Sequence, residues 1–223
     1  MARISNISRE TKETSIQARL NLGGGEVRVD TGIGFLDHML HAMAFYAGFG
    51  LDLTARGDLN VDGHHTVEDT GIVLGQAIRE ALGDKRGIRR FGSAYVPMDE
   101  ALAFTSLDFS GRAFLVFDAD MPQERIGDYD SCLTEEFMRA LAFNGGITLH
   151  QRGVYGKNAH HITEALCLLF IGLIMAFILV ISIFPFPDNP AIFFSIFYIF
   201  MSILFILPPA KILGLLTAYE VAF

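Results

Sequence analysis

The chain has 223 residues, a formal net charge of −8 and a hydrophobic content of 51%, so it can bury one sizeable core or two smaller ones. The acidic balance argues against sequence-independent binding of nucleic acid, which needs many lysine and arginine contacts to phosphates. The two cysteines form no CxxC pair, which argues against a disulfide framework and suits a reducing compartment.

Charged residues are unevenly distributed along the chain. After Glu164 the charged residues are Asp188, Lys211 and Glu220, whereas the preceding part has the mixed composition of an ordinary soluble domain. The N-terminal stretch MARISNISRETKE is polar and lacks the apolar core of a secretory signal. The sequence therefore divides into a part of soluble type and an apolar tail.

In the first part, strands are expected at 14–22 and 26–32, where apolar and polar residues alternate. The three glycines between them predict a hairpin turn. A phosphate-binding loop is the weaker interpretation, because the Lys-Ser/Thr ending of such a loop is missing. The next elements are expected as a helix over 36–47, a strand over 51–56 and a helix over 65–82, which Gly83 would end.

A similar order of elements is expected further along the chain. It comprises strands near 93–98, 103–109 and 113–119, a helix near 134–144, a strand near 147–152 and a helix from His160 onward. These elements parallel those expected in the first half.

Two segments of the chain are similar in sequence. DHMLHAMAFYAGFGLD at 37–52 aligns with EEFMRALAFNGGITLH at 135–150, which predicts a tandem repeat. We expect an α/β fold, an α+β sandwich of two related halves, each a small sheet covered by two helices. The expected domain boundaries are 1–90, 91–165 and an apolar helical tail at 166–223.

The motif His-His-x-x-Glu occurs twice, at 64–68 and at 160–164. On a helix, positions three and four apart share a face, so each glutamate lies beside its two histidines. The adjacent histidines point about 100° apart, so each is expected to bind a different metal ion. The two copies predict a two-metal site or sites shared between chains, and Mn, Fe, Zn and Ni all suit imidazole and carboxylate ligands.

A further pair of ligands is suggested by the repeat. His38 and Glu136 occupy equivalent positions upstream of the two motifs. A single helix-start histidine, or a single His-His pair, is more commonly a surface feature than a ligand. The repetition of the whole pattern is what favours metal binding.

The chain resembles the imidazoleglycerol-phosphate dehydratase family over residues 3–165. The resemblance rests on seven segments that occur in the family's order: TGIGFLDHML, HHTVED, GIRRFG, PMDEAL, SGR, TEEFMRALAFNGGITLH and YGKNAHHITEA. It implies dehydration of imidazole glycerol phosphate to imidazole acetol phosphate in histidine biosynthesis. It also implies a cytoplasmic 24-subunit homo-oligomer whose active sites lie between subunits.

The resemblance further implies a cofactor, two manganese ions in each active site that bind the imidazole ring as imidazolate. The metal ligands it implies are His38, His64, His65, Glu68, Glu136, His160, His161 and Glu164. At position 136 family members carry either His or Glu.

Other residues are assigned to the substrate by the same resemblance. Glu13 matches a glutamate that contacts the substrate, and Arg90 and Arg112 match residues that hold its phosphate. Chemically, a carboxylate such as Glu164 or Glu13 could transfer protons during loss of water. Without the resemblance, both arginines could equally be solvated surface charges.

The tail departs from the family. The amphipathic helix and Ser-x-Lys-Gly ending of the family are absent, and uncharged runs occupy 165–184 and 191–207. The first run is long enough to cross a bilayer and the second is marginal, so membrane association through 165–207 is expected. Two alternatives follow: a catalytically impaired, membrane-attached metal-binding derivative with a frameshift or fusion tail, and a two-metal phosphatase acting on the same ester.

Overall fold

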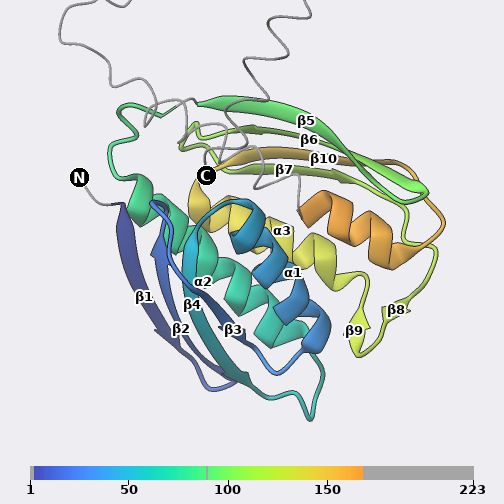
Figure 1. Cartoon of the computed structure of the whole chain (residues 1–223). Helices are drawn as coiled ribbons and strands as arrows, with labels where there is room; N and C mark the ends of the chain where they lie inside the picture. The colour runs from blue at the N-terminus through green and yellow to red at the C-terminus, as the bar shows by residue number, and fades with distance from the viewer. Residues whose placement is uncertain (1–2, 89, 168–223) are drawn as a thin grey trace, which may run out of the picture. The chain divides into compact units, whose positions relative to one another are not determined.

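A computed structural model describes residues 3–88 and 90–167 of the chain. These residues form two four-stranded sheets with helices between them (Figure 1), so the predicted mixed α/β fold is confirmed. The predicted helical tail at 166–223 lies outside the described residues, apart from its first two positions. No helix within the described residues is long and apolar enough to cross a membrane.

The first sheet has the strand order β1-β2-β4-β3, and its strands are β1 (Ile4–Glu10), β2 (Thr14–Asn21), β3 (Val27–Asp30) and β4 (Gly50–Gly57). Strands β1, β2 and β4 are antiparallel neighbours, whereas β3 runs parallel to β4. Alternate residues of β2, such as Ile16, Ala18 and Leu20, are buried, which is the pattern of a sheet with one face on the core.

The second sheet has the order β5-β6-β10-β7, and its strands are β5 (Phe91–Met98), β6 (Ala101–Asp108), β7 (Phe114–Asp118) and β10 (Thr148–Tyr155). Its pairing directions are those of the first sheet, with two antiparallel pairs and a final parallel pair. A small ribbon follows β7, formed by β8 (Arg125–Ile126) and β9 (Tyr129–Asp130). The two sheets therefore share one topology, which is what a tandem repeat requires, while the boundaries at 90 and 165 stay a prediction.

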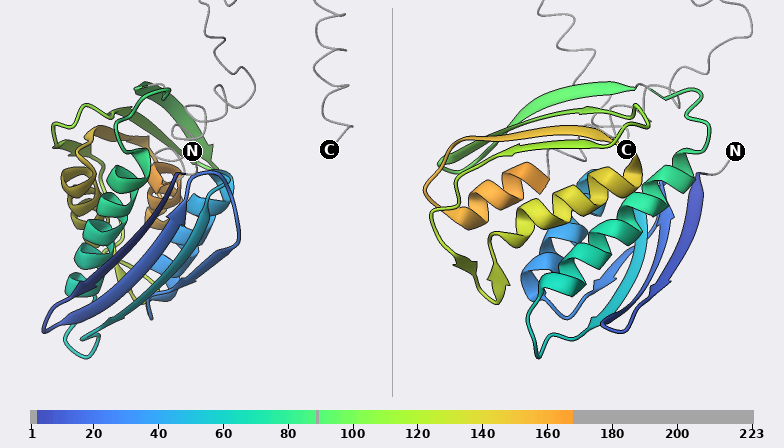
Figure 2. Two further views of the ribbon diagram at one scale, coloured as in Figure 1. Left: turned by 90° about the vertical axis from the view of Figure 1, so that its left-hand side faces the viewer. Right: turned by 180° about the vertical axis from the view of Figure 1, so that it is seen from behind.

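The helices fill the space between the sheets (Figures 1 and 2). They are α1 (Gly34–Tyr46), α2 (His64–Leu82), α3 (Leu133–Gly145) and a helical segment at 159–167. In each half one helix precedes the last strand of the sheet and one follows it. This placement brings the starts of the last helix of each half, where the His-His motifs lie, to the ends of β4 and β10.

Helices α2 and α3 pack against each other through glycines. A Cβ atom added at Gly71 would lie 2.7 Å from the carbonyl oxygen of Phe137, and one at Gly75 would lie 2.5 Å from that of Leu141. No side chain fits at either position. Glycine at both positions therefore allows the backbones of α2 and α3 to approach closely. The main hydrophobic core surrounds this contact and includes Leu74 and Met138.

Two expectations about the first sheet were wrong or incomplete. The predicted hairpin between 14–22 and 26–32 does not form, because β4 lies between β2 and β3. The glycines instead allow a close crossing: a Cβ atom at Gly50 would lie 2.9 Å from the oxygen of Gly24 and 3.0 Å from the Cα atom of Gly25. Strand β1 was not predicted from the sequence.

Candidate active site

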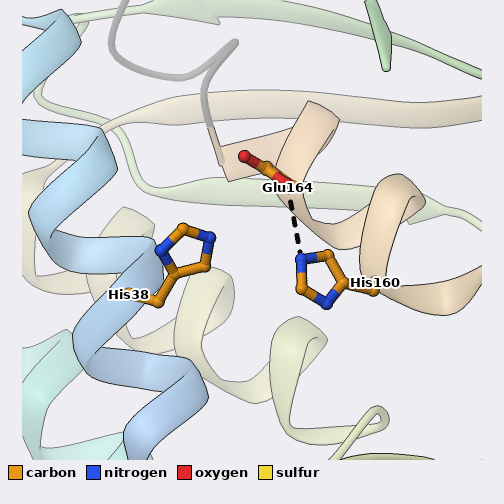
Figure 3. Close-up of side chains that lie close together, drawn as sticks. All are labelled: His38, His160 and Glu164. Atoms are coloured by element: carbon orange, nitrogen blue, oxygen red, sulfur yellow. Dashed lines mark ion pairs between the residues drawn. The ribbon is translucent and has the colours of Figure 1, made fainter. Parts of the chain in front are cut away.

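Three of the predicted ligands lie together between α1 and the helical segment at 159–167. The ligand atoms of His38, His160 and Glu164 all lie within 4.8 Å of one another (Figure 3). The Nε2 atom of His160 is 3.5 Å from Oε2 of Glu164, and the rings of His38 and His160 are 5.9 Å apart at their centroids. No other group of three among the described residues meets this distance.

The second motif occupies the start of α2. Nε2 of His64 is 3.8 Å from Oε2 of Glu68, one turn along the helix. This pair corresponds in the repeat to His160 and Glu164. Glu136, which corresponds in the repeat to His38, lies on the neighbouring helix α3. Its carboxylate is 3.9 Å from Nε of Arg139. Glu136 is therefore on the expected helix but outside the close group.

Both motifs begin at helix starts that a side chain stabilises. The Oδ1 atom of Asp62 accepts a hydrogen bond of 2.8 Å from the backbone N–H of His64, and Oδ1 of Asn158 accepts one of 3.0 Å from that of His160. The first backbone N–H groups of a helix have no partner inside the helix, so such acceptors fix its start. The same local device thus sets the orientation of both His-His pairs.

The second histidine of each pair is held by a carboxylate that sequence reasoning missed. Nδ1 of His65 lies 3.1 Å and 3.2 Å from the two oxygens of Asp58. Nδ1 of His161 lies 2.6 Å from Oε2 of Glu100. Asp58 lies seven residues before His65 and could have been considered, whereas Glu100 is 61 residues from His161 and has no local signal.

These contacts shift the pKa values of the groups involved. The hydrogen bond to Asp58 raises the pKa of His65, and the hydrogen bond to Glu100 raises that of His161. The bond from His161, followed by the backbone N–H of Lys157, lowers the pKa of Glu100 to about 2. Glu100 is therefore ionised at neutral pH.

Glu13 lies in the turn between β1 and β2, where it is exposed. Its backbone N–H donates to Oγ1 of Thr11 at 3.1 Å. After the hydrogen bond and the charge of Asp58, the charge of Glu13 also contributes to the raised pKa of His65.

The two predicted phosphate-binding arginines lie at one end of the second sheet. Arg90 precedes β5, and its Nε and Nη2 atoms bond to the two oxygens of Asp108 at 2.5 Å and 2.9 Å. Arg112 precedes β7, where Ser110 and Thr148 hold its backbone and its side chain is exposed. Both guanidiniums are near the surface, and that of Arg90 is oriented by Asp108.

Arg90 and Arg112 lie at the opposite end of the second sheet from the His160 motif of the same chain. Phe91 pairs with Asp108, and Thr148 pairs with Phe114. These pairs form the end of the sheet beside Arg90 and Arg112. Strand β10 runs from Thr148 at that end to Tyr155 near the His160 motif, a length of 8 residues or roughly 25 Å. A site that used both sets of residues would need more than one chain.

The fold and this arrangement define an α/β protein that presents repeated groups of imidazole and carboxylate at helix starts. Comparison with known proteins specifies the family. A family model described as imidazoleglycerol-phosphate dehydratase matches residues 31–170. The chain is 55% identical over 167 residues to the imidazoleglycerol-phosphate dehydratase of Acetivibrio thermocellus, covering 74% of this chain and 86% of that protein.

Other relatives agree with this result. The dehydratase of Clostridium acetobutylicum is 55% identical over 165 residues, 74% of this chain and 84% of its own. The crystal structure of the Staphylococcus aureus dehydratase has a TM-score of 0.71 at 37% identity, covering 77% of this chain and 96% of that one. The Pyrococcus furiosus structure, in complex with (S)-C348, has a TM-score of 0.67 at 37% identity, covering 76% and 91%.

The chain therefore belongs to the imidazoleglycerol-phosphate dehydratase family. It is an enzyme of the lyase class.

Proposed function

We propose that the chain removes water from imidazole glycerol phosphate to give imidazole acetol phosphate, a step of histidine biosynthesis, and that it does so in the cytoplasm with two manganese ions per active site. The observation that supports this most directly is the group of His38, His160 and Glu164, whose ligand atoms lie within 4.8 Å of one another. Membership of the dehydratase family gives the reaction.

The residues of the group fit a divalent transition-metal ion. Neutral imidazole and carboxylate are ligands that manganese accepts, and two helices hold them side by side. His38, His160 and Glu164 would hold one ion. By the equivalence of the two halves, His64, Glu68 and Glu136 would hold the other.

The remaining predicted ligands, His65 and His161, are outside the close group. Their side chains are 45% and 26% exposed, so they can complete sites on neighbouring copies of the chain. This assignment uses all eight predicted ligands.

The chemistry of the reaction explains why a metal is needed. The hydrogen to be removed lies on a carbon with no carbonyl beside it, so a carboxylate alone is too weak a base. When bound, manganese supplies Lewis acidity to the ring nitrogens of the substrate. Glu164 or Glu13 would move the proton, and an acid must also assist departure of the neighbouring hydroxyl.

Arg90 and Arg112 would hold the substrate phosphate. A guanidinium offers two parallel N–H groups to phosphate oxygens. In Arg90 the bond to Asp108 already fixes the orientation of the guanidinium, which reduces the entropy lost on binding. The two arginine side chains would thus position the phosphate end of the substrate, which is the end remote from the reacting carbon.

The separation of arginines and histidines supports active sites shared between subunits. Only three carbons separate ring and phosphate in the substrate, about 5 Å of chain at ordinary bond lengths, far less than the length of β10. Association also explains the exposed aromatic residues of the second sheet, where Phe91, Tyr95 and Phe114 are 59%, 62% and 56% exposed. The family resemblance suggests a 24-subunit assembly.

A turnover assay on imidazole glycerol phosphate tests the proposal. We expect imidazole acetol phosphate to form, with loss of activity in His160→Ala and little change in His41→Ala, a matched exposed histidine on α1. Release of inorganic phosphate in place of the acetol phosphate would show a phosphatase and contradict the proposal.

A further inference from the structure

We propose that Asp58 and Glu100 are positioning residues that orient His65 and His161, so that Nε2 of each ring faces a bound metal ion; this inference rests on the proposed function. Neither carboxylate belongs to the predicted ligand set. Each contacts Nδ1 of a predicted ligand.

Glu100 is itself held rigidly. Its Oε1 atom accepts hydrogen bonds from the backbone N–H groups of Lys157 and Asn158, at 3.1 Å and 2.9 Å. Its Oε2 atom lies 2.6 Å from Nδ1 of His161. The carboxylate therefore links the β5–β6 turn to the segment that leads into the helix at 159–167, and it fixes the ring at the start of that helix.

The same contact decides which ring nitrogen carries the hydrogen. An ionised carboxylate only accepts hydrogen bonds, so Nδ1 must be the donor, and in the neutral ring Nε2 then keeps its lone pair. The side-chain amide nitrogen of Asn158 is 3.5 Å from Nε2 of His161. The carboxylate of Asp99, 77% exposed, is also 3.5 Å from this atom. Metal-binding histidines are commonly oriented by a carboxylate that accepts a hydrogen bond from the other ring nitrogen, as Glu100 does from Nδ1.

The two halves of the repeat differ in how they achieve this. Glu13 and Glu100 occupy equivalent places, each immediately before the second strand of its sheet, at Thr14 and Ala101. In the second half that glutamate holds the histidine. In the first half Asp58 holds His65, from a loop after β4 that is two residues longer than its counterpart.

This difference has a consequence for Glu13. Because Asp58 holds His65, the carboxylate of Glu13 is available at the surface for another partner, as the role of a substrate-contacting residue requires. Each half therefore has a carboxylate that contacts its second histidine, but the two carboxylates, Asp58 and Glu100, lie in loops that are not equivalent.

Two variants test the orienting role of each carboxylate. In Glu100→Gln, the backbone N–H groups of Lys157 and Asn158 still donate to the side-chain oxygen. The amide N–H₂ of the glutamine therefore faces Nδ1 of His161. That arrangement favours hydrogen on Nε2 and blocks the ligand atom. Asp58→Ala removes the partner of His65. The controls are Glu26→Gln, just before β3, and Asp52→Asn, on β4, neither of which contacts a histidine among the described residues.

The measurement is titration of the metal-free full-length chain with Mn²⁺, followed by the EPR signal of the free ion. We expect affinity for Mn²⁺ to fall about 10–100-fold in Glu100→Gln and Asp58→Ala and to be unchanged in both controls. Excess Mn²⁺ should restore turnover. The melting temperature of metal-free Glu100→Gln at pH 8 should stay within about 3 °C of the wild type.

Each outcome has a definite meaning. Affinities equal to the wild type in both variants would overturn this inference and leave the proposed function intact. A similar loss of affinity in the controls would also overturn it, because the effect would then be nonspecific. A wild-type chain that binds no Mn²⁺ would end the inference and the proposed metal site together.

Discussion

Arg112 and His161 lie at opposite ends of the second sheet, Arg112 just before β7 begins and His161 just after β10 ends. Strand β10 pairs in parallel with β7 and is 8 residues long. The two side chains are therefore separated by most of the length of the sheet within one chain. If both act on one small substrate, they must come from different chains.

This relationship predicts complementation between two defective chains. We expect Arg112→Ala to weaken substrate binding about 10–100-fold, the loss of a charge-assisted contact, and His161→Ala to abolish turnover. In mixed oligomers of the two, about one quarter of the sites would combine a wild-type arginine with a wild-type histidine. Turnover of co-expressed chains at low substrate concentration checks this.

The control is a mixture prepared from separately purified, unmixed oligomers. If co-expression restores no more activity than that mixture, the active site does not lie between subunits in the way the separation requires.

Glu164 is expected to act mainly in the transition state. Glu164→Gln should lower kcat by roughly 10²–10⁴-fold, the usual contribution of a positioned acid or base, while KM changes little. The measurement is steady-state kinetics at full metal loading, with Glu135→Gln as a control on an exposed helical ion pair. Unchanged turnover at saturating substrate would remove Glu164 from the proton transfer.

Gly75 is expected to be essential for the packing of α2 on α3. A Cβ atom there would lie 2.5 Å from the oxygen of Leu141 and 2.9 Å from the nitrogen of Gly145. Gly75→Ala should therefore reduce the free energy of unfolding by about 1–3 kcal/mol, as measured by urea denaturation. Gly34→Ala, where nothing lies within 4 Å of the added atom, is the control, and an equal effect there would contradict the packing argument.

The bond between Glu100 and His161 predicts a pH-dependent contribution to stability. The pKa of Glu100 is lowered from 4.5 to about 2, so its contribution is present above pH 4.5 and is lost as the pH falls toward 2. The pKa of His161 is raised from 6.5, so its contribution is present below pH 6.5 and is lost as the pH rises through the raised value.

The two effects together give a maximum at mildly acidic pH. The metal-free wild type should exceed Glu100→Gln in stability most clearly between pH 4.5 and 6.5, and less at pH 3 and pH 8. Urea denaturation of both proteins at pH 3, 5.5 and 8 checks this. A difference in stability that does not vary with pH would contradict it.

The helices could be predicted from the sequence, because their apolar periodicity and terminal residues are local. Helix α2 was expected over 65–82 and spans His64–Leu82. Strand β1 was missed because its fully buried residue, Ser5, is polar and is satisfied by a hydrogen bond of 2.8 Å to the oxygen of Ala77. No apolar alternation marks such a strand.

The predicted hairpin failed for a related reason. Alternation locates a strand but does not specify its neighbour, and the parallel pairing of β3 with β4 depends on a later part of the chain. In the same way, the repeat indicated which histidines belong together, but the contact of Glu100 with His161 depends on the path of the β5–β6 turn. The roles of the predicted ligands stay predictions.

The most direct test of the proposed function is turnover of imidazole glycerol phosphate by the metal-free chain before and after addition of Mn²⁺, with the bound metal counted in the same samples. We expect no dehydration without metal, and full activity when about two Mn²⁺ ions are bound per chain. Full activity in protein shown to contain no metal would contradict the account.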